Sequence, residues 1–169
     1  VKSFLEKMDN PTSNLINAGC YIFKSEVIQQ IPIDQVVSVE RQTFPELLKS
    51  GAQVFGYLDN SYWLDIGTPA ALVKASADLI MGKIFSPATP KHEGECLVAA
   101  DSNIDSSTRV EKGSSIAPKV IIESNCQITG SIIGRGAKIG ADCKIIDSII
   151  APNTQISAGM IVNSNYLGF

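Results

Sequence analysis

The chain has 169 residues, of which 44% are apolar and 18% charged, a composition typical of a soluble globular protein with one sizeable core or two modest ones. A net charge of −3 and the absence of any Lys/Arg cluster exclude the electrostatic footprint of nucleic-acid or anionic-membrane binding. No apolar stretch approaches the roughly 20 residues of a membrane span, and no signal-peptide pattern opens the chain, so a cytoplasmic protein is expected.

The first segment, residues 1–81, mixes strand and helix signals, which predicts an α/β region. Three stretches are apolar, rich in β-formers and bounded by Gly, Pro, Asn or Asp, and we interpret them as sheet strands: Val1–Leu5, Leu15–Phe23 and Val54–Leu58.

Helix signals lie between and after these strands. Ser25 is placed to cap a short helix over Glu26–Gln30, and a second short helix is predicted over Pro45–Ser50. Thr68 followed by a proline begins a longer helix, which Gly82 ends.

Residues 82–94 form a polar stretch punctuated by Pro87, Pro90 and Gly94, and the alternation of helix and strand stops there. We therefore predict a domain at 1–81, a linker at 82–94 and a second domain at 95–169.

The second domain has an aliphatic residue every five or six positions: Ile116, Ile122, Ile128, Ile133, Ile139, Ile145, Ile150, Ile156 and Val162. Ile128 to Lys144 aligns with Ile145 to Ile161, which gives a period of 17 residues, or three faces of six, six and five. This pattern predicts a triangular β-solenoid, since each repeat buries its aliphatic face only by stacking on the next.

A small side chain recurs four positions after most of the aliphatic residues, and small groups suit the narrow, flat interior of such a coil. These residues are Thr108, Ser114, Val120, Cys126, Ala137, Cys143 and Thr154. The corners should favour Gly, Asn and Asp, which tolerate positive φ.

The four cysteines have no CxxC spacing, and with the single His92 they make a poor metal set. Cys126 and Cys143 are one period apart and should stack in adjacent coils. A disulfide would fit that spacing, but we interpret both as free thiols that act as small apolar groups.

A set of short motifs carries a family resemblance. In chain order they are Phe4-Leu5-Glu6-Lys7, Ile16-Asn17-Ala18-Gly19-Cys20-Tyr21-Ile22-Phe23, Ser38-Val39-Glu40, Phe44-Pro45 and Tyr62-Trp63-Leu64-Asp65-Ile66-Gly67-Thr68-Pro69. With the repeats behind them, they resemble the second half of a Rossmann-like sugar-phosphate nucleotidyltransferase domain followed by a left-handed parallel β-helix. The resemblance covers nearly the whole chain and is strongest to the mannose-1-phosphate guanylyltransferase branch.

The resemblance implies transfer of a nucleotidyl group from an NTP to a hexose 1-phosphate, with GTP and mannose 1-phosphate favoured and pyrophosphate released. Lys7 matches the lysine that the family directs at the sugar phosphate, and Glu6 matches a residue that accepts hydrogen bonds from sugar hydroxyls. Asn17 offers a donor and an acceptor to the sugar, and we expect it to be a buried polar group in an apolar strand. Gly19 allows close backbone approach. Trp63 is placed to line the pocket or to pack in the core.

Asp65 matches the family's second metal-binding aspartate, which would hold Mg²⁺. Without the resemblance, Asp65 and Gly67 would equally fit a simple turn.

Two departures from the family pattern stand out. Met8 replaces the usual proline after Glu-Lys, and the Gly-rich nucleotide loop with the first metal aspartate is absent. We therefore expect this chain to be a fragment, inactive alone, with an unpaired sheet edge that demands association, most simply as a homo-oligomer.

Two other functions stay open. The repeats also resemble hexapeptide acyltransferases, but those generally use a histidine base within the coil, and His92 lies in the linker. The second is a non-catalytic oligomerisation or regulatory module built on the flat sides of the solenoid.

Overall fold

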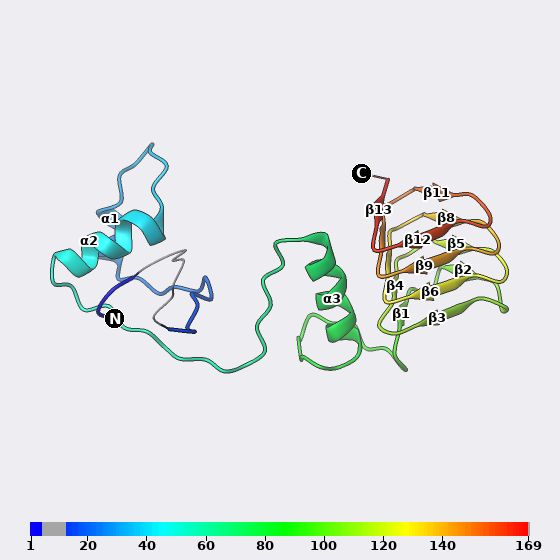
Figure 1. The fold of residues 1–169 in the computed structure, drawn as a ribbon, viewed down its shortest axis with the longest axis horizontal. Coiled ribbons are helices and arrows are strands. Elements are labelled where there is room, and N and C mark those ends of the chain that lie inside the picture. The colour runs from blue at the N-terminus through cyan, green and yellow to red at the C-terminus, as the bar shows by residue number, and fades with distance from the viewer. Residues whose placement is uncertain (5–12, 169) are drawn as a thin grey trace. The chain divides into compact units, whose positions relative to one another are not determined.

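The computed structural model describes residues 1–4 and 13–168, which divide into two compact units, Val1–Trp63 and Leu64–Phe169 (Figure 1). The predicted positions Glu6 and Lys7 lie outside the described residues. No helix of the described part is long and apolar enough to cross a membrane.

The described part of the first unit contains three short helices, α1 (Ser25–Gln29), η1 (Val39–Thr43) and α2 (Phe44–Lys49). The two predicted short helices are therefore confirmed within one residue at each end. The expected cap is wrong, because Ser25 lies inside the first turn and the N-cap Lys24 makes no side-chain bond. Ser38 caps η1 instead, since its hydroxyl accepts the Arg41 N–H at 3.2 Å.

None of the three predicted strands is formed in the described residues, and Leu5, the last residue of the first predicted strand, lies outside them. Within residues 1–4 and 13–63 no segment pairs in a β-ladder. The apolar side chains of these segments face solvent, with exposures of 68% for Ile16, 99% for Ile22 and 92% for Tyr57. A strand exists only where a neighbour satisfies its N–H and C=O groups, so β-propensity alone leaves these stretches extended and unpaired.

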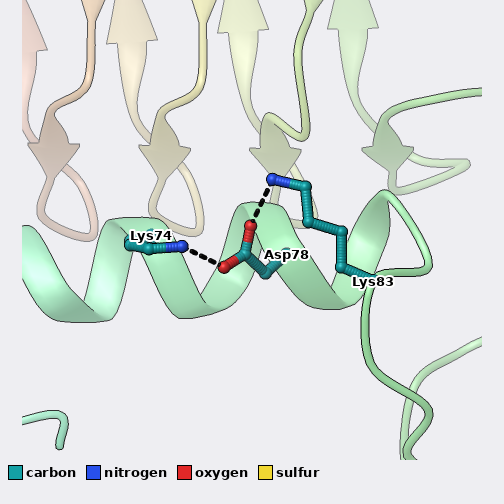
Figure 2. A network of polar contacts seen from close by, with 3 residues as sticks. All are labelled: Lys74, Asp78 and Lys83. Carbon is teal, nitrogen blue, oxygen red and sulfur yellow. Dashed lines mark hydrogen bonds and ion pairs between the residues drawn. The ribbon is translucent and has the colours of Figure 1, made fainter. Parts of the chain in front are cut away.

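The second unit opens with helix α3 (Pro69–Ile80), as predicted. Thr68 caps it by accepting the Ala71 N–H at 3.2 Å, and Gly82 follows its end at φ 70°. Asp78 of α3 is 2% exposed, and its carboxylate is paired with both Lys74 and Lys83 (Figure 2). The ion pair to Lys83 fastens the start of the predicted linker to the helix.

The rest of the unit is a parallel β-solenoid of about four turns, whose strands stack as rungs in Figure 1. The first sheet contains β1 (Leu97–Val98), β4 (Ser115–Ile116), β7 (Ile132–Ile133), β10 (Ile149–Ile150) and β13 (Tyr166–Leu167). The second sheet contains β2 (Asn103–Ile104), β5 (Ile121–Ile122), β8 (Lys138–Ile139) and β11 (Gln155–Ile156). The third sheet contains β3 (Arg109–Glu111), β6 (Gln127–Thr129), β9 (Lys144–Ile146) and β12 (Ile161–Asn163).

The strand register confirms the predicted 17-residue period and adds one exception. Ile128 pairs with Ile145, 17 residues on, whereas Val110 pairs with Ile128, 18 residues on. The extra residue of the first coil is Gly113, which lies at φ 74° in the corner before β4. A Cβ built there would lie 2.7 Å from the Cα of Ala77, so glycine is what lets α3 approach this corner.

The predicted aliphatic residues form the core. Ile128, Ile133, Ile145 and Ile150 are all 0% exposed. Each buried side chain of this size contributes about 1.5–3 kcal/mol, and stacking lets neighbouring coils share that burial.

The corners hold columns of left-handed residues, as their composition predicts. One column contains Lys119, Gly136 and Asn153, with φ between 60° and 68°. Asn and Gly tolerate this conformation, whereas Lys119 adopts it at a cost.

Hydroxyl and thiol groups line the inside of two corners as ladders. The Ser131 hydroxyl donates to the Thr129 carbonyl at 2.8 Å and accepts the Ser148 N–H at 3.1 Å. The Cys126 thiol donates to the Gly140 carbonyl at 3.1 Å, and the Cys143 thiol to that of Ser157 at 3.2 Å. Both thiols are buried and free, as predicted, and burial raises the pKa of Cys143.

Candidate functional site

A cluster of three polar side chains stands out in the first unit. The Asn17 amide nitrogen donates to the Tyr21 phenol oxygen and to the Glu40 carboxylate. The Tyr21 hydroxyl donates to the same carboxylate oxygen of Glu40 at 2.9 Å. These groups carry donors and acceptors on a surface that solvent reaches, because Asn17 is exposed and Tyr21 and Glu40 are half-buried.

The polar cluster stands on an aromatic one. Phe44 is 8% exposed, and its ring centroid lies 4.9 Å from that of Phe4, 5.1 Å from Tyr21 and 5.7 Å from Phe23. Glu40 comes from η1, which runs directly into α2 at Phe44. The ring of Tyr21 is therefore fixed by apolar packing while its hydroxyl takes part in the polar cluster.

Gly19 and Trp63 complete this surface. The Gly19 N–H donates to the Asn17 side-chain oxygen at 3.1 Å, and Gly19 has a φ of 75° with open space where a Cβ would be. The Trp63 indole N–H donates to the Ala18 carbonyl at 3.4 Å, and the residue is 49% exposed. Trp63 therefore lies beside the Asn17 turn and is not a core residue.

The expectation for Asn17 needs correction. We predicted a buried polar group in a strand, but Asn17 is exposed and in no strand. Its amide is organised by side chains distant in sequence, with Glu40 23 residues away.

Asp65 belongs to the second unit, so the predicted site residues are divided between the units. The Asp65 side chain is exposed and lies against Gly67, where a Cβ would be 3.4 Å from its carboxylate oxygen. Thr68, the cap of α3, follows directly. A Cβ at Gly67 would therefore make only ordinary van der Waals contact with Asp65.

Asp65 fits part of a magnesium site. Among the residues that the structure describes, no group of three His, Cys, Asp or Glu side chains could hold a metal ion. Mg²⁺, however, is commonly bound by one or two carboxylates together with substrate phosphates and water, and an exposed carboxylate supplies one such ligand.

Comparison with known families accounts for both parts of the chain. The model of the family described as nucleotidyl transferase matches residues 1–81, and that described as GlmU-like, C-terminal hexapeptide matches residues 86–166. The chain belongs to the sugar-phosphate nucleotidyltransferase family. It carries an α/β region of the nucleotidyl transferase domain, followed by the hexapeptide β-solenoid.

Individual relatives point the same way. A mannose-1-phosphate guanylyltransferase of Mycobacterium tuberculosis is 39% identical over 96% of this chain and 41% of the relative. A glucose-1-phosphate adenylyltransferase of Acetivibrio thermocellus is 30% identical over 90% of this chain and 45% of the relative. A mannose-1-phosphate guanyltransferase of Schizosaccharomyces pombe is 27% identical over 75% of this chain and 31% of the relative. The chain thus spans less than half the length of these nucleotidyltransferases.

Tyr21 and Glu40 were not predicted as site residues, although both lie in the quoted motifs. The missed signal was chemical. The hydroxyl of Tyr21 and the carboxylate of Glu40 lie in two short motifs, and both were available to share the amide of Asn17.

Proposed function

We propose that this chain carries the hexose-phosphate-binding part of an enzyme that joins mannose 1-phosphate to the guanylyl group of GTP. A phosphate oxygen of the sugar 1-phosphate forms a bond to the α-phosphorus of GTP, the bond from that phosphorus to the bridging oxygen breaks, and pyrophosphate leaves. Mannose and guanine are favoured over glucose and adenine by the greater similarity to the guanylyltransferase of M. tuberculosis.

The observation that carries this proposal is the cluster of Asn17, Tyr21 and Glu40. Sugar hydroxyls both donate and accept, so a hexose site needs both kinds of group held in fixed positions. The Glu40 carboxylate accepts, the Asn17 amide does both, and Gly19 leaves open space above the turn. Trp63 supplies an exposed aromatic face beside the same turn.

The charged residues that the family resemblance singles out would have separate tasks. Lys7 would hold the phosphate of the sugar, since a compact ammonium with three donors suits a phosphate, and Glu6 would accept from the sugar hydroxyls. Asp65 would be one ligand of Mg²⁺, which neutralises phosphate charge when bound.

We further propose that the 169-residue chain has no transfer activity by itself. It spans 41% of the M. tuberculosis relative. Incubation of the purified chain with GTP, mannose 1-phosphate and MgCl₂ should release no pyrophosphate above background. GDP-mannose formation by this chain alone would contradict this part of the proposal.

The hexose assignment is tested in a fusion of this chain behind the first part of the nucleotidyl transferase domain of that relative. Asn17→Ala should raise KM for mannose 1-phosphate at least about tenfold and leave KM for GTP within about twofold. The variant loses the amide offered to the sugar and its bond to the charged Glu40 carboxylate, and a hydrogen bond to a charged group contributes about 1.5–3 kcal/mol. Ser13→Ala, at an exposed position of the same segment, is the matched control. An unchanged KM for the sugar phosphate in the Asn17 variant would refute the assignment.

Homo-oligomerisation is a second part of the proposal. Each of the three sheets ends in a strand with one unpaired backbone edge, at β13, β11 and β12 on one side of the described coil. Such edges accept a further strand or a second copy. Sedimentation velocity at several concentrations should show association, and a monomer throughout would exclude it.

Acyl transfer is not favoured. The chain has one histidine, His92, and the coil from Leu97 to Leu167 contains none. Both nitrogens of His92 are engaged by backbone carbonyls, so no general base of the expected kind faces the coil.

A further inference from the structure

His92 bridges two backbone carbonyls. Its Nε2 lies 2.9 Å from the carbonyl oxygen of Ile80, the last residue of α3, and its Nδ1 lies 3.0 Å from that of Pro90 in the linker. Both partners are acceptors only. A neutral imidazole has one N–H and one lone pair, so only the doubly protonated ring donates to both carbonyls.

The end of α3 favours a cation at this position. The backbone N–H groups of Met81, Gly82 and Lys83 donate to carbonyls earlier in the helix, those of Ala77, Leu79 and Asp78. The carbonyl of Ile80 is left for the imidazole. Carbonyls at a helix C-terminus carry partial negative charge, which an imidazolium complements.

The surroundings of the ring contain few charges. His92 lies in an open groove of about 620 Å³ formed by the end of α3 and the linker, and the other charged residues that line it are Lys91 and Glu93. Lys83 and Asp78, at the same helix end, are paired with each other at 2.7 Å. The two carbonyls, that of Pro90 first and that of Ile80 second, raise the pKa of His92 above 6.5, and slight desolvation opposes them.

We propose that His92 is a proton-dependent clasp that fastens residues 82–94 to the C-terminal end of α3. With the proton bound, the ring donates to both carbonyls and joins the linker to the helix. After the proton leaves, one nitrogen presents a lone pair to a carbonyl oxygen, that contact is lost, and the linker is released at one end. Because this linker joins the two family segments, the clasp makes their connection stiffer at low pH.

The sign of the stability effect follows from the direction of the shift. A histidine whose pKa is raised in the folded state stabilises that state fully below its unfolded value, about 6.5. This stabilisation disappears as the pH rises through the folded pKa. It is separate from the titration of Asp and Glu, which occurs at more acidic pH.

Having one histidine makes the test direct. Long-range ¹H–¹⁵N spectra of the 169-residue chain should show both ring nitrogens protonated up to a midpoint above pH 6.5. Backbone order parameters of Ala88 and Thr89, whose N–H groups bond to Ser86, should fall from about 0.85 toward about 0.6 as the pH passes that midpoint. Amides of the coil serve as the internal reference and should not change.

Two variants test whether the order of the linker depends on protonation of His92. His92→Ala removes both donors of the clasp, so the linker amides should be mobile at every pH. His92→Arg keeps a charged, multidentate donor at all pH values, so the linker should stay ordered across the range. A midpoint at or below 6.5, equal linker order on both sides of it, an ordered linker in the Ala variant or a pH-dependent linker in the Arg variant would each overturn the proposal.

Discussion

The two units contain similar apolar, β-prone sequences and use them differently. Ile22 and Tyr57 in the first unit lie in unpaired segments, whereas Ile133 and Ile139 in the second unit lie in ladders. The difference is the availability of a partner. In the solenoid every strand finds its neighbour 17 or 18 residues away in the same chain, whereas the described part of the first unit offers no paired neighbour. Strand formation is decided by pairing more than by propensity.

A charge placed inside the coil should cause the largest loss of stability. Ile139 is 1% exposed, and Ile139→Asp should cost at least about 4 kcal/mol, because the carboxylate would be buried without a partner. Lys138→Asp, at the neighbouring exposed position of β8, is the control and should stay within about 0.5 kcal/mol. Circular dichroism during thermal unfolding measures both. A melting temperature for the Ile139 variant within a degree of the parent would contradict a solenoid core.

The packing of α3 on the coil depends on Gly113. Gly113→Ala combines left-handed strain with a Cβ 2.7 Å from Ala77, so about 2–4 kcal/mol should be lost. Gly159→Ala is a matched control, because Gly159 has a similar φ of 75° but nothing within 4 Å, and it should lose only about 1–2 kcal/mol. Urea unfolding gives the difference, which reports the helix contact. Equal losses would mean that α3 does not pack at this corner in solution.

The hydroxyl ladder makes a smaller contribution. Ser131→Ala removes the acceptor of the Ser148 N–H and the donor to Thr129, both buried, and should cost about 1–3 kcal/mol. Ser157→Ala, on the exposed side of the coil, should be nearly neutral. Chemical denaturation of the pair is the measurement, and indistinguishable midpoints would exclude an energetic role for the ladder.

Relief of backbone strain at Lys119 should change the free energy of unfolding least, and it should raise this free energy where the other variants lower it. Lys119→Asn places a residue that tolerates φ 61° in the column with Gly136 and Asn153, and should stabilise the coil by about 0.5–1 kcal/mol. Lys119→Ala keeps the strain of a Cβ in this conformation and should give no gain. The same denaturation experiment resolves the two, and a destabilised Asn variant would show that the lysine makes contacts worth more than its strain.

The solenoid could be predicted from the sequence because the same spacing of aliphatic residues recurs from coil to coil. The spacing of Ile128, Ile133 and Ile139 states the same rule several times, and the inward positions of Cys126 and Cys143 follow from it. Gly113 could not be found in this way, since one inserted residue is a departure from the rule and its reason is a contact with α3.

The candidate site was predictable only in part. The motifs drew attention to Asn17, Gly19 and Asp65 through the family resemblance. The grouping of Asn17 with Tyr21 and Glu40 depends on contacts across 23 and 19 residues, which no local pattern encodes. The expected strands around Asn17 failed for a related reason, because pairing is a property of the surroundings and not of the segment.

Hydrogen exchange of the 169-residue chain tests the contrast between the two units most directly. Amides within the ladders, such as those of Ile132, Lys138 and Lys144, donate to the next coil at 2.9 Å and should exchange only on global unfolding of the solenoid. Amides of Leu15–Phe23 and Val54–Leu58 have no ladder partner and should exchange at nearly unprotected rates. Protection of those two segments equal to that of the coil would contradict the account.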